Sequence, residues 1–192
     1  MAGNKISICI AGKNQCAIEA LKYLILNYKK NYNILALPNK NDEGNDTWQK
    51  SFKKFAISKN VKIINLKKLY TIKNLYFFSI EYENILKIEN FNSGNLFNIH
   101  FSLLPKYKGC HTNFYQIYYG EKYSGVSLHK IDGGIDTGPL VSQISFEVPL
   151  NSTAYENYLK LMKYSVIIFK KNLKKILNNN YNLKKQNSKK GS

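Results

Sequence analysis

Cysteine, acidic residues and long apolar runs are all scarce in this sequence of 192 residues. The three cysteines have no metal-like spacing, and Cys9 and Cys16 lie in apolar stretches where a thiol packs as a small hydrophobe. The apolar run in KISICIAG breaks at Gly12, too early for a signal-peptide core or a membrane span. We therefore expect a reduced, cytoplasmic protein without membrane insertion.

The shortage of acidic residues leaves the chain strongly basic. Twenty-nine Lys and Arg stand against twelve Asp and Glu, which gives a formal net charge of +17. Such a charge favours anionic partners, whether nucleotides, nucleic acid or an acidic membrane surface, and does not choose among them. Most of these lysines are expected on solvated faces.

No internal repeat or linker divides the chain. Its length and its hydrophobic fraction of 44% fit one globular domain with a sizeable core. We predict a single domain over residues 1–180, followed by a disordered tail over residues 181–192.

Runs rich in β-branched residues alternate with amphipathic stretches in the first half of the chain. KISICIAG closes on glycine, and the stretch after it carries Ala17, Leu21, Leu24 and Tyr28 at helical spacing. Further strands are predicted over residues 33–37, 61–65, 74–82 and 95–102, and a helix over residues 47–60. This order predicts an α/β fold with an open, mostly parallel twisted sheet flanked by helices.

The second half continues with a predicted helix over residues 111–121 and two strands over residues 124–131 and 139–148. The glycine-rich turn DGGIDTG between these strands favours a hairpin at the far edge of the sheet. A long amphipathic helix over residues 152–179 should cover the sheet, opened by a capping box from Thr153 to Glu156. Its apolar stripe is expected to run through Leu159, Met162, Val166, Phe169 and Leu173.

In open α/β sheets, ligands bind beyond the carboxyl ends of the strands. Three loops follow predicted strands: GKNQ, SIEYEN and HFSLLPKYKG. Backbone N–H groups and Lys13 in the first loop can hold a phosphate, although an ordinary turn fits the same residues equally well.

Asn98 and His100 occupy alternate positions of a predicted strand, so they share one face of the sheet. Taken alone, the pair fits a hydrogen-bonded structural role. The turn from Asp132 to Gly138 adds the carboxylates of Asp132 and Asp136. A carboxylate beside His100 fixes its tautomer, and Asn98 supplies an amide donor to an oxyanion. These groups suit acyl transfer to a nitrogen nucleophile, without a serine or cysteine nucleophile.

NIHFSLLPKYKG followed by SGVSLHKIDGGIDTGPLVSQ resembles the formyltransferase family that uses N10-formyltetrahydrofolate. The matching positions are Asn98, His100, Ser102, Leu104, Pro105, Gly109, Gly134, Asp136, Thr137 and Gly138.

The resemblance implies a Rossmann-like formyltransferase fold, N10-formyltetrahydrofolate as co-substrate and no metal. It also implies direct transfer, in which an amine attacks the formyl carbon while Asn98 and His100 stabilise the tetrahedral intermediate. Asp136 positions His100 and helps to move the proton. The implied folate pocket is lined by Phe78, Ser79, Ile80, Tyr82, Leu104, Asp132 and Ile135, although residues of the strand that carries Phe78 fit plain core packing as well.

The acceptor amine differs among members of this family. Methionyl-tRNA formyltransferases carry a C-terminal barrel, for which no residues are expected after the long helix, and glycinamide ribonucleotide formyltransferases carry a small-residue phosphate loop where this chain has AGKNQCA. The sequence looks most like sugar N-formyltransferases that act on dTDP-linked aminodideoxy sugars for lipopolysaccharide O-antigen. It favours dTDP-4-amino-4,6-dideoxyglucose, with a dTDP-3-amino-3,6-dideoxyhexose or glycinamide ribonucleotide as alternatives.

A nucleotide-linked aminosugar as substrate suits the basic charge of the chain. The candidate substrate-binding residues are Lys13, Asn14, Lys106, Lys108, Gly109 and His111. Each lysine also fits a surface position, and His111 also fits the start of a helix. We expect a homodimer and no nucleic-acid partner.

Two other classes of function stay open. A basic, Tyr-rich protein can bind nucleic acid by base stacking, which predicts salt-dependent binding that does not need Asn98, His100 or Asp136. A formyltetrahydrofolate hydrolase would use water in place of the amine.

Overall fold

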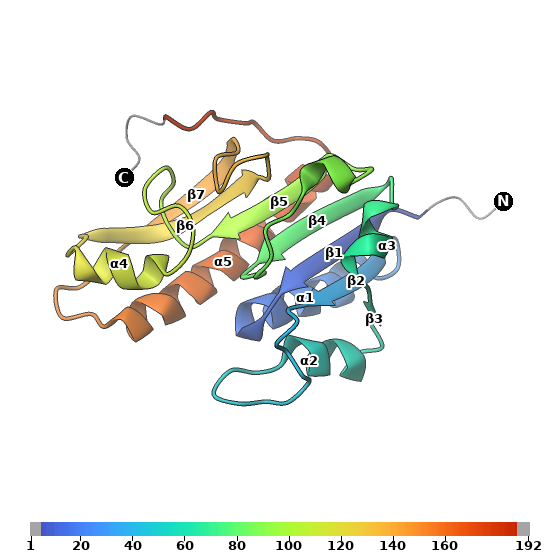
Figure 1. Ribbon diagram of the computed structural model, residues 1–192, viewed down its shortest axis with the longest axis horizontal. Helices are drawn as coiled ribbons and strands as arrows, with labels where there is room; N and C mark the ends of the chain where they lie inside the picture. Colours follow the sequence, from blue (N-terminus) through green and yellow to red (C-terminus); the bar gives the residue numbers. More distant parts are fainter. Residues whose placement is uncertain (1–4, 188–192) are drawn as a thin grey trace. The chain divides into compact units, whose positions relative to one another are not determined.

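The computed structural model describes residues 5–187 and has the predicted α/β architecture (Figure 1). Seven strands form a mostly parallel sheet in the order β3-β2-β1-β4-β5-β6-β7, with helices flanking it. The chain divides into two compact units, one ending at Phe97 and the other beginning at Asn98.

The first unit is built on buried parallel strands. β1 (Ser7–Gly12) lies between β2 (Asn33–Pro38) and β4 (Leu75–Ile80), and β2 also pairs with the short β3 (Lys62–Ile63). Every residue of β1 and β4 is buried, as expected for parallel strands covered on both faces. Gly12 is required here because a Cβ at this position would lie 1.9 Å from the carbonyl oxygen of Ile80.

The helices of the first unit differ in part from the prediction. α1 (Asn14–Tyr28) follows β1 as expected, but α2 (Phe52–Ser58) is much shorter than the helix predicted over residues 47–60. Ser51 caps α2 by accepting the backbone N–H of Lys54 at 2.9 Å, and the residues before it form a loop. The short helix α3 (Leu66–Tyr70) and the 3₁₀ turn η1 (Ile88–Asn90) were not predicted.

The second unit contains the predicted edge hairpin. β5 (Asn95–His100) leads through a long loop and α4 (Thr112–Tyr118) to β6 (Tyr123–Lys130), which pairs antiparallel with β7 (Leu140–Glu147). In this pair Val126 lies opposite Ile144, and the register shifts between Leu128 and His129.

α5 (Ala154–Leu177) packs against β6 and β7 and begins with the predicted capping box of Thr153 and Glu156. Its predicted apolar stripe is partly wrong, because Leu159 is 43% exposed. The buried face instead runs through Leu161, Ser165, Ile168, Phe169, Asn172, Leu173 and Ile176. Two polar residues on this face form hydrogen bonds within the helix: Ser165 donates to the carbonyl oxygen of Met162, and Asn172 donates to that of Ile168.

The start of the predicted disordered tail is bound to the sheet. Lys184 and Leu140 exchange two backbone hydrogen bonds of 2.8 Å, so residues 181–187 are held against the beginning of β7 (Figure 1). Residues 188–192 lie outside the described part of the chain. Among residues 5–187, no helix is long and apolar enough to cross a membrane.

Candidate active site

β5 ends with two polar side chains at the predicted alternate positions. Asn98 is half-buried, His100 is 7% exposed, and Ile99 between them is buried on the other face. The chain then turns through a cis peptide bond between Leu104 and Pro105 and reaches Gly109 with a left-handed φ of 83°.

Asp136 is the carboxylate that these residues contact. Its Oδ1 atom accepts a 3.0 Å hydrogen bond from Nδ2 of Asn98, and its Oδ2 atom lies 3.4 Å from Nδ1 of His100. The backbone N–H of Gly109 donates to Oδ2 at 2.9 Å. The three residues predicted to be catalytic therefore lie in direct contact, and their catalytic role stays a prediction.

The turn that carries Asp136 is shaped by its neighbours. Asp132 accepts hydrogen bonds from the N–H of Gly134 at 3.2 Å and from the hydroxyl of Thr137 at 2.6 Å. Asp136 has a left-handed φ of 51°, and a Cβ at Gly138 would lie 1.8 Å from the carbonyl oxygen of Lys130. Close approach of the turn to the end of β6 therefore requires glycine at position 138.

The electrostatics of this cluster favour an ionised Asp136. Burial raises the pKa of Asp136, but the contact with His129, the charge of His100 and the N–H of Gly109 lower it, to a net pKa of about 2. Burial lowers the pKa of His100, although the charge of Asp136 and the carbonyl of Tyr107 oppose this effect.

His129 belongs to the same cluster, and the sequence analysis missed it. It is 2% exposed, and its Nε2 atom lies 3.2 Å from Nδ2 of Asn98 and 3.3 Å from Oδ1 of Asp136. The signal was available, because Ser127 and His129 alternate with apolar residues on a strand that precedes the acidic turn.

The hydrogen bonds fix the tautomer of His129 and the orientation of Asn98. The carbonyl oxygen of Lys130 lies 2.7 Å from Nδ1 of His129, and since a carbonyl only accepts, Nδ1 carries the hydrogen. Nε2 of the neutral ring then accepts from Asn98, whose second Nδ2 hydrogen goes to Asp136. An oxyanion must therefore replace one of these two acceptors to receive a hydrogen bond from Asn98.

His100 lies between two acceptors. Its Nε2 atom donates to the carbonyl oxygen of Tyr107 at 2.6 Å, while Nδ1 faces Asp136. The side chain of Tyr107 is in turn held by Glu121, which accepts from the Tyr107 hydroxyl at 2.8 Å and from Nζ of Lys106 at 2.9 Å.

The loop from residue 101 to residue 110 is anchored to the hairpin. The hydroxyl of Ser127 donates to the carbonyl oxygen of Ser102 at 2.6 Å and accepts the N–H of Leu104 at 3.0 Å. Gln143 on β7 donates to the carbonyl oxygen of Leu104 at 2.9 Å. Polar side chains of the hairpin therefore hold the loop that carries Gly109, whose N–H donates to Asp136.

The residues predicted to line a folate pocket fall in both units. In the first unit, Phe78 and Ile80 are fully buried on β4, Ser79 is 7% exposed, and Tyr82 lies edge to face with Phe77. In the second unit, Leu104 is buried and Asp132 is used within its turn, whereas Ile135 is 55% exposed. An exposed isoleucine beside Asp136 offers apolar surface to a ligand.

The residues predicted to bind the substrate also fall in both units. Asn14 is 2% exposed and donates to the carboxylate of Glu81, so its amide faces an acidic group. Lys13 is half-buried directly before α1.

In the second unit Lys106 is paired with Glu121, Lys108 is half-buried, and Gly109 binds Asp136. His111 is exposed with a left-handed φ of 57° directly before α4. Of the four predicted substrate residues in this unit, Gly109 is therefore the one that contacts the cluster around Asp136.

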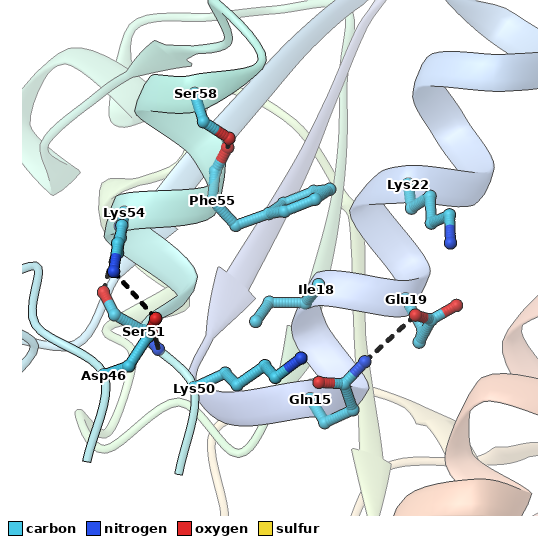
Figure 2. A pocket seen from close by; sticks show the side chains of 10 residues that line it. All are labelled: Gln15, Ile18, Glu19, Lys22, Asp46, Lys50, Ser51, Lys54, Phe55 and Ser58. Carbon is cyan, nitrogen blue, oxygen red and sulfur yellow. Dashed lines mark hydrogen bonds and ion pairs between the residues drawn. The ribbon is translucent and has the colours of Figure 1, made fainter.

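A separate hollow of about 320 Å³ lies within the first unit (Figure 2). The α1 side chains Gln15 and Glu19 form a 3.0 Å hydrogen bond, and Lys54 pairs with Asp46 at 2.8 Å. Figure 2 shows the two pairs on different sides of the hollow. None of the predicted site residues lines this hollow. Within residues 5–187, no group of three or more His, Cys, Asp or Glu side chains is arranged to hold a metal ion.

Known proteins similar to this chain share the chemistry implied by its motifs. A family model described as formyl transferase matches residues 81–173. WlaRD, a sugar 3N-formyl transferase solved in the presence of dTDP and 5-N-formyl-THF, is 47% identical with a TM-score of 0.93, over 99% of this chain and 70% of its own. The N-formyltransferase of Helicobacter canadensis, solved with folinic acid and dTDP-3-aminofucose, is 43% identical with a TM-score of 0.92, over 97% and 70% of the two chains.

Among curated proteins, the bifunctional polymyxin resistance protein ArnA of Wigglesworthia glossinidia brevipalpis is 40% identical over 111 residues. That match covers 58% of this chain and 16% of ArnA, so the chain spans much less than two thirds of this relative. The similarity to the two solved N-formyltransferases extends over almost the whole chain. The chain therefore belongs to the formyltransferase family of enzymes.

Proposed function

We propose that this protein is a sugar N-formyltransferase that moves a formyl group from N10-formyltetrahydrofolate to the amino group of a dTDP-linked 3-amino-3,6-dideoxyhexose. The cluster of Asn98, His100 and Asp136 carries the proposal, since it joins an amide, an imidazole and an ionised carboxylate at the end of β5. The two similar N-formyltransferases support the choice of donor and acceptor.

The position of the amine is where the proposal departs from the sequence analysis, which favoured a 4-amino sugar. WlaRD is a sugar 3N-formyl transferase, and the Helicobacter canadensis enzyme was solved with dTDP-3-aminofucose. At 47% and 43% identity these enzymes support the 3-amino alternative.

Formyl transfer of this kind forms one carbon–nitrogen bond and breaks another. The free amine attacks the formyl carbon, the formyl oxygen becomes an oxyanion, and the bond from the formyl carbon to N10 breaks as a proton passes from the amine nitrogen to N10. Preorganised donors stabilise the oxyanion, and a positioned base carries the proton. We assign the first task to Asn98 and His100, and the positioning of His100 to Asp136.

His129 links these two tasks. In its neutral form Nε2 of His129 accepts a hydrogen bond from Asn98. If the proton that leaves the amine is held at Nε2 of His129 on its way to N10, His129 becomes a donor to Asp136, 3.3 Å away, and releases one hydrogen of the Asn98 amide. That hydrogen is then available to the oxyanion at the moment when the proton leaves the amine.

The folate co-substrate is assigned to the residues predicted from the sequence. Ile135, exposed beside Asp136, would contact its apolar ring surface, and the turn that Asp132 shapes would present backbone groups to its polar edge. Phe78, Ser79, Ile80 and Tyr82 of the first unit keep, as part of this proposal, the folate-binding role that the resemblance implies for them.

The other sequence predictions accompany this assignment as proposals. They are a single catalytic domain over residues 1–180, a homodimer, a cytoplasmic location and a role in lipopolysaccharide O-antigen synthesis.

A panel of acceptors tests the proposal. The purified protein is incubated with N10-formyltetrahydrofolate and, separately, with dTDP-linked 3-amino sugars, dTDP-linked 4-amino sugars and glycinamide ribonucleotide. We expect the 3-amino sugars to gain one formyl group with the highest kcat/KM by mass spectrometry. Preference for a 4-amino sugar would overturn the sugar assignment, and formylation of glycinamide ribonucleotide alone would overturn the sugar class.

A further inference from the structure

The segment after α5 returns to the turn that carries Asp136. Lys184 forms two backbone hydrogen bonds with Leu140, the first residue of β7. This bridge places Gln186 beside the turn, where its Nε2 atom donates to the carbonyl oxygen of Asp136 at 2.9 Å and to that of Gly138 at 2.7 Å. The tail therefore contacts the backbone of a residue at the centre of the proposed site.

The two carbonyls fix the orientation of the Gln186 amide. Carbonyl oxygens only accept, so the NH₂ group must face them and each of its hydrogens has one acceptor. The Oε1 atom is buried and has no hydrogen-bond partner among residues 5–187. Burial of an acceptor without a partner is unfavourable. The two hydrogen bonds from Nε2 to the turn are therefore the interactions that hold this side chain in place.

The hydrogen bonds from Gln186 reach a part of the turn with an unfavourable backbone conformation. Asp136 adopts a left-handed φ of 51°, which costs free energy for a residue with a Cβ. Gln186 bridges the carbonyl of this residue and the carbonyl two positions later. A change in the turn would move the Asp136 carboxylate relative to Asn98, His100 and the N–H of Gly109.

We propose that Gln186 is a positioning residue for formyl transfer, which holds the turn so that the Asp136 carboxylate stays in contact with His100 and Asn98. The proposal rests on the proposed function for its effect on catalysis. It assigns to the tail a role in the site that lies 50 residues earlier in the chain.

Replacement of Gln186 by methionine is the test, because methionine has a similar length and lacks the amide. Gln186→Met should lower kcat by about tenfold to a hundredfold, the scale expected when a catalytic group is misplaced by about 1 Å. Lys184→Met is the matched control, since the Lys184 side chain is exposed and its bridge to Leu140 uses the backbone alone. The control should keep the wild-type kcat.

The titration of His100 gives a second readout that does not depend on activity. The charge of Asp136 raises the pKa of His100, whereas burial and the charge of His129 lower it. Loss of the two hydrogen bonds from Gln186 weakens the contact between His100 and Asp136. The pKa of His100 should therefore fall in Gln186→Met and stay unchanged in Lys184→Met. The chain has three histidines, and NMR of their ring protons, assigned with single-histidine variants, can follow each one.

The outcomes separate the two proposals. If the wild-type protein transfers no formyl group, the proposed function fails, and the titration of His100 still decides whether Gln186 positions Asp136. A lower melting temperature with an unchanged kcat and an unchanged His100 titration would show a purely structural role and overturn the proposal.

Discussion

The carboxylate of Asp136 lies 3.4 Å from Nδ1 of His100, and both side chains are almost completely removed from solvent. His100 approaches from the end of β5, whereas Asp136 comes from the turn between β6 and β7. The contact joins the end of β5 to the turn between β6 and β7 and places an ionised carboxylate against a buried imidazole. In the proposed mechanism, this pair is the group that must be in place before the amine attacks.

Asp136→Asn and His100→Asn should each reduce kcat by at least about a hundredfold, the scale of positioned proton-transfer and oxyanion groups. Asparagine keeps the approximate size of both side chains, so the fold should survive. Steady-state kinetics at saturating donor measures the loss, and circular dichroism checks the fold. If the variants fold and keep near-normal turnover, Asp136 and His100 do not have the proposed catalytic roles.

His129→Phe should lower kcat to a similar extent, because phenylalanine keeps the ring but cannot accept the hydrogen bond from Asn98 or take up a proton. The KM for the sugar should change less than kcat, since His129 is 2% exposed and contacts Asn98 and Asp136. Measuring kcat and KM for the variant and the wild type distinguishes a role of His129 in catalysis from a role in substrate binding. An effect on KM alone would place His129 in substrate binding and contradict the proton role.

Gly138→Ala should lower both stability and activity. The added Cβ would lie 1.8 Å from the carbonyl oxygen of Lys130, so the turn has to move away from the end of β6. Overpacking of this kind costs about 1–3 kcal/mol. Urea denaturation measures the stability, and Gly133→Ala is the matched control because a Cβ at position 133 meets no atom within 4 Å. Equal stabilities for the two variants would contradict the described packing.

The stability of the protein should fall on the acid side in a range set by Asp136. Its folded pKa is lowered from 3.8 to about 2, so the folded state binds fewer protons than the unfolded state between these values. The stabilisation, of order 2 kcal/mol, is present above about pH 4 and is lost as the pH falls towards 2. The free energy of unfolding, measured from pH 5 downwards, should fall less steeply in Asp136→Asn. Parallel curves for the two proteins would contradict the lowered pKa.

The sequence predicted the strands well because buried parallel strands read as continuous apolar runs, as in β1 and β4. It predicted the contact between Asp136 and His100 because a resemblance joined two separated motifs. It did not predict where α2 starts. Asp42 accepts from the hydroxyl of Ser51 and from the N–H of Lys53, which fixes the cap from outside the helix.

Other features depended on contacts between distant residues. The middle of α5 is apolar on most sides, so periodicity alone did not identify the face that packs on β6 and β7. Gln186 contacts carbonyls 48 and 50 residues away, and no local pattern marks such a bond. His129 was visible as a polar residue on an apolar strand, but its partners became evident only in the folded chain.

The central claim is that this site passes a formyl group directly from folate to a sugar amine. The most direct test uses N10-formyltetrahydrofolate with a ¹³C label in the formyl group and a dTDP-linked 3-amino sugar, with ¹³C NMR of donor and acceptor during turnover. The label should leave the folate and appear on the sugar nitrogen in equal amounts, and Asp136→Asn should slow both changes together. Release of the label as free formate, without formylated sugar, would contradict it.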